Sequence, residues 1–125
     1  MKFLLDTNFL MIPGQFRVDI FGQLEQLGPV DLCVTDLSVR ELEKLAKNKG
    51  RKGAHARLAL LLIQWEGVEV VPSGKTTHAD EAIRRIAKRE GMVVCTLDKG
   101  LKAALKRRGI RVVTLRQKKY LGFEC

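Results

Sequence analysis

The sequence predicts an α/β fold in which helices cover both faces of a parallel β-sheet. Three observations indicate this class: five short apolar runs rich in valine, polar or glycine and proline residues at their ends, and segments of helical periodicity between them. The 125 residues suit one domain, residues 1–125, which is long enough to bury a substantial hydrophobic core.

The five apolar runs are predicted to be buried strands because they are short and continuous. They cover residues 2–5, 31–35, 68–71, 92–96 and 111–115. Between them, apolar residues recur at helical spacing and predict helices over residues 19–27, 38–47, 54–65, 82–87 and 101–105. Gly91 and Gly109 follow basic helices and are natural stops. The tail from Gln117 has no clear period and is expected to form an extra edge element or a partner-binding end.

The charge balance favours a polyanionic partner. Lys and Arg total 23 against 14 Asp and Glu, which gives a net charge of +9. Nucleic acid is the commonest polyanion that such a domain binds, and solubility alone is the other explanation. The most apolar segment, residues 58–65, is far shorter than the roughly 18 residues of a membrane span. No signal segment is visible at the start, so we expect a cytoplasmic protein without a membrane partner.

The three cysteines show no metal-binding spacing. Cys33 and Cys95 sit inside apolar runs, and Cys125 ends the sequence. We expect buried small hydrophobic residues rather than disulfides or structural zinc. The two histidines, His55 and His78, are isolated and are expected at surface or helix-start positions.

Four acidic residues are predicted to meet at one edge of the sheet. Asp6 follows the first strand and Asp98 lies two residues past the fourth, and ligands of open parallel sheets bind beyond the carboxyl ends of the strands. Glu41 lies one turn into its helix, and Asp80 lies at the start of another. Clustered carboxylates repel one another and need a cation or a proton, and an all-oxygen set favours Mg²⁺ or Mn²⁺.

Each acid also has a simpler explanation. Asp6 could be a turn residue, and Asp98 could only cap the helix that follows it. Glu41 and Asp80 compete with their neighbours Glu43 and Glu81 and could be ordinary helix acids.

Polar neighbours accompany the acids at the same edge. Thr7, Asn8 and Thr96 are expected to hold carboxylates or waters, or only to form turns. The segment "SGKTT" at residues 73–77 suggests a phosphate loop, but Glu69 stands where the first glycine of that motif belongs, so a P-loop is not expected.

Four segments together resemble the motifs of the PIN-domain ribonucleases. They are "LLDTN", "VRELEKL", "HADEAI" and "VCTLDKGLK", in the order and spread of that family. The sequence is most similar to small archaeal PIN proteins related to ribosomal-RNA-processing nucleases, and PIN proteins of this size include VapC toxins. Here "ADE" replaces the family's "ADD", which leaves the part played by Glu81 open.

The resemblance implies a three-layer α/β/α sandwich with strand order 3-2-1-4-5. It implies that Asp6, Glu41, Asp80 and Asp98 hold Mg²⁺ or Mn²⁺, with Asn8 and Thr96 as supporting groups. The expected activity is endoribonuclease hydrolysis by a metal-activated water, leaving 5′-phosphate and 3′-hydroxyl ends. A toxin would have an antitoxin partner, whereas a processing enzyme would act on a structured precursor, and the sequence leaves both open.

Basic residues around the acids are expected to hold RNA. Phosphate contacts would come from some of the exposed cations, and the best placed are Lys44, Lys47, Arg51, Lys52 and Lys99. Trp65 is expected in the core or in a dimer contact, and the apolar segment 58–65 is the predicted homodimer surface.

Two other functions compete with the nuclease. A phosphoacceptor receiver domain needs an aspartate after its central strand, which "VEVVPSG" lacks. A non-cleaving RNA-binding or ribosome-assembly factor that keeps the metal site in vestigial form is the alternative function.

Overall fold

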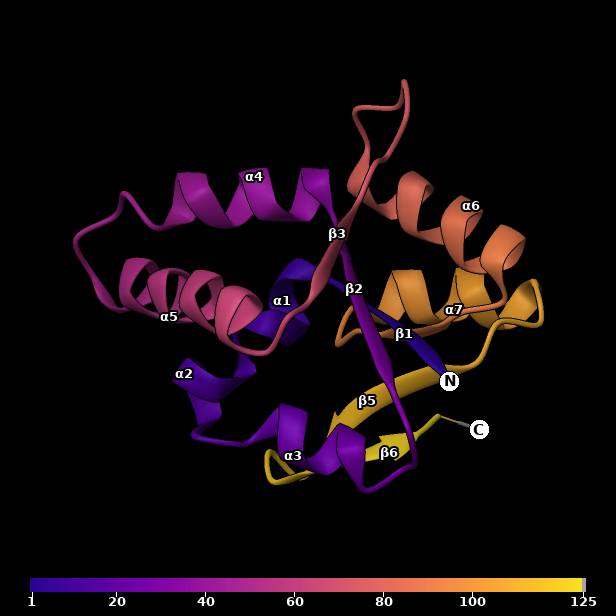
Figure 1. The fold of residues 1–125 in the computed structure, drawn as a ribbon, viewed down its shortest axis with the longest axis horizontal. Helices are drawn as coiled ribbons and strands as arrows, with labels where there is room; N and C mark the ends of the chain where they lie inside the picture. Colours follow the sequence, from indigo (N-terminus) through magenta and orange to yellow (C-terminus); the bar gives the residue numbers. More distant parts are fainter. Residues whose placement is uncertain (125) are drawn as a thin grey trace.

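The computed structural model describes residues 1–124 and contains one six-stranded sheet, in the order β3-β2-β1-β4-β5-β6 (Figure 1). The strands are β1 (Lys2–Leu5), β2 (Asp31–Thr35), β3 (Glu69–Val71), β4 (Val93–Cys95), β5 (Val112–Arg116) and β6 (Tyr120–Phe123). The first five are parallel, as their apolar character predicts, and their order confirms the expected 3-2-1-4-5 arrangement.

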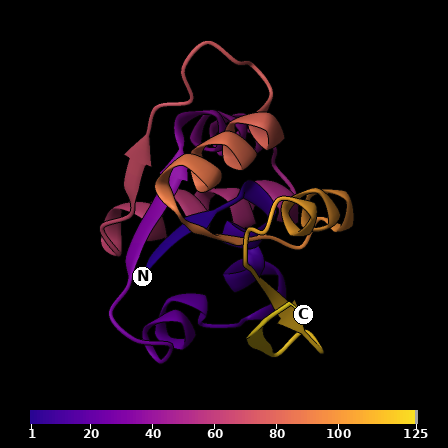
Figure 2. The same cartoon turned by 90° about the vertical axis from the view of Figure 1, so that its right-hand side faces the viewer.

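Helices lie on both faces of the sheet (Figures 1 and 2). They are α1 (Thr7–Leu10), α2 (Ile12–Phe16), α3 (Ile20–Glu25), α4 (Asp36–Leu45), α5 (Arg51–Trp65), α6 (Ala79–Glu90) and α7 (Lys99–Arg107). Side chains alternate along β1, so Phe3 and Leu5 pack with α1 to α5 while Leu4 packs with α6 and α7. The predicted three-layer sandwich is therefore confirmed.

The helices α1 and α2 are absent from the sequence-based expectation. They are four and five residues long, too short for helical periodicity to be read from the sequence. Phe9, Leu10 and Ile12 are fully buried, and Phe16 is partly buried. They fold the chain back beneath α4 and α5, directly after Asp6.

The tail forms an edge strand, which confirms the expectation of an extra edge element. β6 pairs antiparallel with β5. Gln23 of α3 contacts this hairpin from the neighbouring layer: its Oε1 accepts from the Leu121 N–H at 2.7 Å, and its Nε2 donates to the Lys119 carbonyl at 3.1 Å. The ring of Phe123 lies 5.2 Å from the Arg111 guanidinium. Cys125 lies outside the described residues.

The expectations for the cysteines and for Trp65 have different outcomes. Cys33 and Cys95 are buried and free, as predicted, and burial raises the pKa of both thiols. Trp65 is 86% exposed, so a place in the core is wrong for it. Because α5 buries the face of Ala56, Ala59 and Ile63, Trp65 at its last position points to solvent.

In residues 1–124, no helix is long and apolar enough to cross a membrane.

Candidate functional site

Four predicted acids line one small cavity at the carboxyl edge of the sheet. Asp6 follows β1 and Asp98 follows β4, and these two strands are adjacent and parallel. The backbone N–H of Asp6 continues the pairing by donating to the Cys95 carbonyl at 3.1 Å. Glu41 on α4 and Asp80 on α6 lie across from them. The cavity has a volume of about 180 Å³, and Thr7, Asn8, Ser38, Ala79 and Ile83 complete its lining.

Asp6 is the buried member of this acid cavity, with 6% of its surface exposed. Its Oδ1 accepts the Phe9 N–H at 2.8 Å, which caps α1, and its Oδ2 accepts the Thr96 hydroxyl. Its pKa is raised to about 6: burial is the main cause, the two hydrogen bonds lower the pKa, and the charges of Asp80 and Asp98 contribute to the rise. The carboxylate is thus fixed in orientation and electrostatically coupled to two other acids.

Thr96 connects Asp6 with Asp98. Its buried hydroxyl donates to Asp6 and accepts the Asp98 N–H at 3.1 Å. Asp98 in turn caps α7 by accepting the Leu101 N–H at 2.8 Å. The helix-cap explanation for Asp98 is therefore correct, and it is compatible with a place in the cavity, because an N-cap side chain lies at the helix start that faces this edge.

Asp80 and Glu41 are more exposed than Asp6 and line both the cavity and the groove next to it. Partial burial raises the pKa of Asp80, with further increases from the charges of Asp98 and Glu41, while Arg84 lowers it. Glu81 is not among the described residues that line the cavity. Its carboxylate accepts a hydrogen bond from the Thr76 hydroxyl at 3.2 Å instead.

The chemistry of the donor set fits a hard divalent cation. All four acids offer only oxygen ligands. Burial is the main cause of the raised pKa values of Asp6 and Asp80, and the charges of neighbouring acids raise both further. Within residues 1–124, no three Asp, Glu, His or Cys side chains are close enough together to hold an ion in this arrangement. Binding would therefore need the exposed Glu41 and Asp80 side chains to move toward Asp6 and Asp98.

A larger groove opens from the acid cavity between α4 and α6. It has a volume of about 630 Å³ and shares Glu41, Ala79 and Asp80 with the cavity. Arg40, Lys44 and His78 also line it. The entrance to the acids is thus flanked by cationic side chains.

The predicted RNA-binding residues occupy different places in the structure. Lys44 lines the groove, and Lys99 is exposed directly beside Asp98. Lys47, Arg51 and Lys52 are exposed at the far end of α4 and the start of α5.

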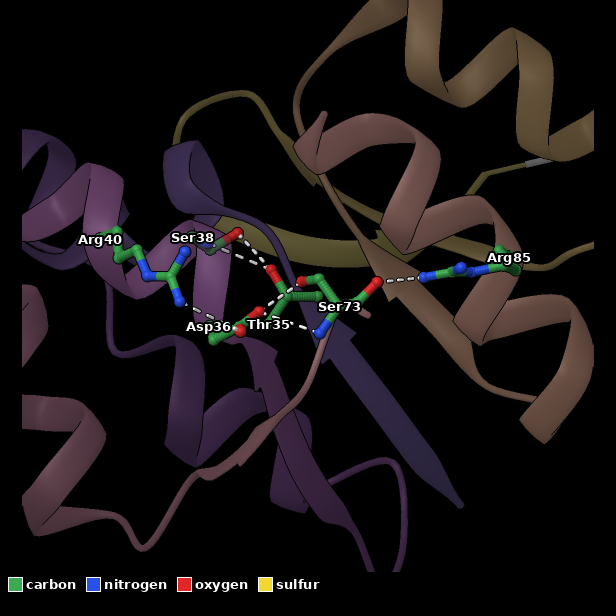
Figure 3. Close-up of polar contacts among 6 residues, drawn as sticks. All are labelled: Thr35, Asp36, Ser38, Arg40, Ser73 and Arg85. Carbon is green, nitrogen blue, oxygen red and sulfur yellow. Dashed lines mark hydrogen bonds and ion pairs between the residues drawn. The ribbon is translucent and has the colours of Figure 1, made fainter. Parts of the chain in front are cut away.

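A polar network beside the cavity was missed by sequence reasoning (Figure 3). It comprises Thr35, Asp36, Ser38, Arg40, Ser73 and Arg85. Asp36 accepts the backbone N–H of Ser73 at 3.0 Å and also its hydroxyl, and these hydrogen bonds lower its pKa. The available signal was positional, since Asp36 and Ser73 each follow a predicted strand at the edge that carries Asp6.

Sequence comparisons find relatives over nearly the whole chain. The family model described as a PIN like domain matches residues 3–118. Ribonuclease VapC9 of Archaeoglobus fulgidus is 36% identical over 121 residues, which cover 96% of this chain and 87% of the relative. Ribonuclease VapC4 of Methanocaldococcus jannaschii is 35% identical over 124 residues, which cover 95% and 93%.

Solved structures have the same fold. The PIN domain endonuclease Utp24 superposes with a TM-score of 0.80 and 25% identity, covering 98% of this chain and 90% of the other. A domain of a functionally unknown protein from Methanocaldococcus jannaschii has a TM-score of 0.64 and 21% identity, covering 92% and 91%, and supports the fold alone. The family match over most of the chain and the two relatives above 30% identity confirm the resemblance seen in the motifs: the chain belongs to the PIN-like domain family.

Proposed function

We propose that the protein is a metal-dependent endoribonuclease. The observation that carries the proposal is the meeting of Asp6, Glu41, Asp80 and Asp98, from four separate segments, around one cavity at the carboxyl edge of the sheet. Two relatives that match nearly the full chain are named ribonucleases, and a structural neighbour is named an endonuclease.

The four acids would hold Mg²⁺ or Mn²⁺. A bound divalent cation supplies Lewis-acid stabilisation of the phosphoryl oxygens and lowers the pKa of a water, which generates the nucleophile at neutral pH. Asp6 contributes a carboxylate that two hydrogen bonds hold in one orientation. Asp98 is held by its cap to α7, and Thr96 fixes the spacing between the two.

The groove provides a path for the RNA strand. A cavity walled by four acids repels a polyanion, and Arg40 and Lys44 line the approach to it. Phosphates flanking the cleaved bond would contact these cations, and the exposed Lys99, the residue after Asp98, would supply a further contact. Such contacts give salt-dependent affinity that depends little on base sequence. Lys47, Arg51 and Lys52 would bind phosphates farther along the strand.

The test is cleavage of single-stranded and structured RNA with and without Mn²⁺, comparing the parent with Asp6→Asn and Asp98→Asn. We expect metal-dependent cleavage with 5′-phosphate products, lost in either variant. The matched control is Asp19→Asn, which changes a helix-capping Asp on α3 and should leave activity intact. Cleavage that is insensitive to chelator would refute the proposal. So would site variants that cleave RNA as well as the parent does.

A non-cleaving RNA-binding factor is the second candidate. The observation that favours it is the spacing of the acids, because within residues 1–124 no three of them are close enough to hold an ion as they stand. The same experiment separates the candidates: RNA binding that persists with Mn²⁺ but yields no cleavage would select the second.

Two cellular roles follow from the nuclease proposal. The relatives with the highest identity above are VapC ribonucleases, which favours the toxin role and an antitoxin partner. Expression of the chain alone should then arrest growth, and Asp6→Asn should abolish the arrest. Normal growth together with cleavage of a structured RNA precursor would select the processing role.

A homodimer through α5 belongs to the same proposal. On the outer face of this helix, Leu61 is 63% exposed to solvent and Trp65 is 86% exposed. Together with Val70 of the edge strand β3, they form an apolar surface that a second copy would cover.

A further inference from the structure

One buried residue ties the loop between β3 and α6 to both walls of the groove. Ser73 is 1% exposed. Its backbone N–H and its hydroxyl both donate to Oδ1 of Asp36 on α4. Its carbonyl accepts from Nη2 of Arg85 on α6. All three polar groups of Ser73 therefore serve to join α4 to α6 (Figure 3).

The fold explains why these residues meet. β2 and β3 are parallel with Thr35 opposite Val71, so the chain leaves both strands at the same edge. Gly74 then turns the chain with a φ of +75°, and a Cβ at this position would lie 3.4 Å from Arg85 Nη2. Glycine suits both the left-handed backbone and the close approach. The segment "SGKTT", which does not fit a phosphate loop, is thus explained as the turn of this junction.

The junction lies close to two of the four acids along rigid helices. Asp36 is five residues before Glu41 on α4, and Arg85 is five residues after Asp80 on α6. Fixing Asp36 and Arg85 to the same residue therefore fixes the two helices, and with them Glu41 relative to Asp80. Both acids are exposed, whereas Asp6 is buried and hydrogen-bonded, so the placement of α4 and α6 governs their spacing.

We propose that Asp36 and Ser73 are positioning residues that set the spacing between Glu41 and Asp80. The inference rests on the proposed metal-dependent function of the same site. Neither residue needs to touch the metal or the RNA, because they act through the placement of α4 against α6. Partners that orient metal ligands in this way typically change metal affinity or activity 10- to 100-fold when they are removed.

The experiment compares Asp36→Ala, which removes the acceptor, with Asp36→Asn, which keeps an acceptor oxygen but removes the charge. Spin labels at Glu43→Cys and Arg89→Cys, both exposed, report the distance between α4 and α6 by pulsed electron resonance. Every labelled protein carries Cys125→Ser. Cys33 and Cys95 are buried and stay in place. Calorimetry measures the Mn²⁺ affinity, and kcat and KM are measured on one short RNA.

We expect Asp36→Ala to broaden the distance distribution, to weaken Mn²⁺ binding about tenfold or more, and to lower kcat with little change in KM. Asp36→Asn should behave like the parent in all three readouts, because the acceptor geometry is kept. The control Asp19→Ala removes the N-cap Asp of α3 and should change none of them. If Asp36→Ala does not fold, Ser73→Ala removes only the hydroxyl donor and takes its place.

The positioning role is overturned by an unchanged distance distribution in Asp36→Ala, or by equal losses in Asp36→Asn, which would indicate a charge effect at the helix start. Equal losses in Asp19→Ala would indicate nothing more than lost stability. A parent that neither binds Mn²⁺ nor cleaves RNA would refute the proposed function, while the distance measurement would still decide whether the junction holds α4 against α6.

Discussion

Replacing Asp6 with Asn should stabilise the metal-free protein at neutral pH. Burial raises the pKa of this carboxyl from its ordinary value of 3.8 to about 6, so folding favours its protonated form. The stabilisation is fully present below about pH 4 and is lost as the pH rises through about 6. At 1.36 kcal/mol per pKa unit, ionised Asp6 costs the folded state about 3 kcal/mol at neutral pH.

Asn removes this cost because it is uncharged at every pH. Its oxygen can accept the Phe9 N–H as Asp6 does, but its amide group must donate to the Thr96 hydroxyl instead of accepting from it. We assign about 1 kcal/mol to that less favourable contact. The net gain is then about 2 kcal/mol, or about 8 °C in Tm for a chain of this size.

The assay is urea unfolding in chelator at pH values from about 4 to about 8, with Asp19→Asn as the control. The parent should lose stability across this range, and Asp6→Asn should lose much less, with Asp80 providing the remainder. The control should follow the parent, because Asn and Asp cap helices equally well. Mn²⁺ should stabilise the parent and not the variant. A variant less stable than the parent at about pH 7.5, or a parent whose stability rises from pH 4 to 7, would refute the reasoning.

Three further predictions follow from the site and the surface. Thr96→Val leaves the part-buried Asp98 N–H without its acceptor and should cost about 1–3 kcal/mol in unfolding free energy. The similarly buried Thr114→Val should cost less, and similar losses would contradict the role of the Thr96 hydroxyl. Lys44→Ala should reduce the slope of log affinity for single-stranded RNA against log salt concentration by about 0.7, and Lys2→Ala, at the opposite edge of the sheet, should leave it unchanged. Leu61→Glu should convert a dimer to a monomer in sedimentation velocity, and a parent that already sediments as a monomer would exclude the α5 dimer.

Local features of the chain account for the parts of the fold that could be predicted. Strand positions follow from continuous apolar runs, and the parallel arrangement follows from their alternation with helices. Asp6 and Asp98 could be placed at one edge because Asp6 directly follows its strand and Asp98 follows its own within a few residues. The spacing of Glu41 and Asp80 relative to helix starts placed them near the same edge, and the structure puts all four acids around one cavity.

Other features depend on contacts between distant residues and have no local signal. The Thr96 hydroxyl meets Asp6 across 90 positions of the sequence, and Ser73 meets Asp36 across 37. Trp65 has the apolar character of a core residue, and only the packing of α5 shows that its side chain faces solvent.

The sequence by itself determined the five parallel strands and the helices α3 to α7, the acids that follow the strands, and the family motifs that they form. These properties depend on periodicity and on neighbours along the chain. The tertiary structure decided the burial that raises the pKa of Asp6, the groove that leads to the acids, and the junction through Ser73. Burial, electrostatic coupling and side-chain hydrogen bonds between segments arise only once the sheet brings those segments together.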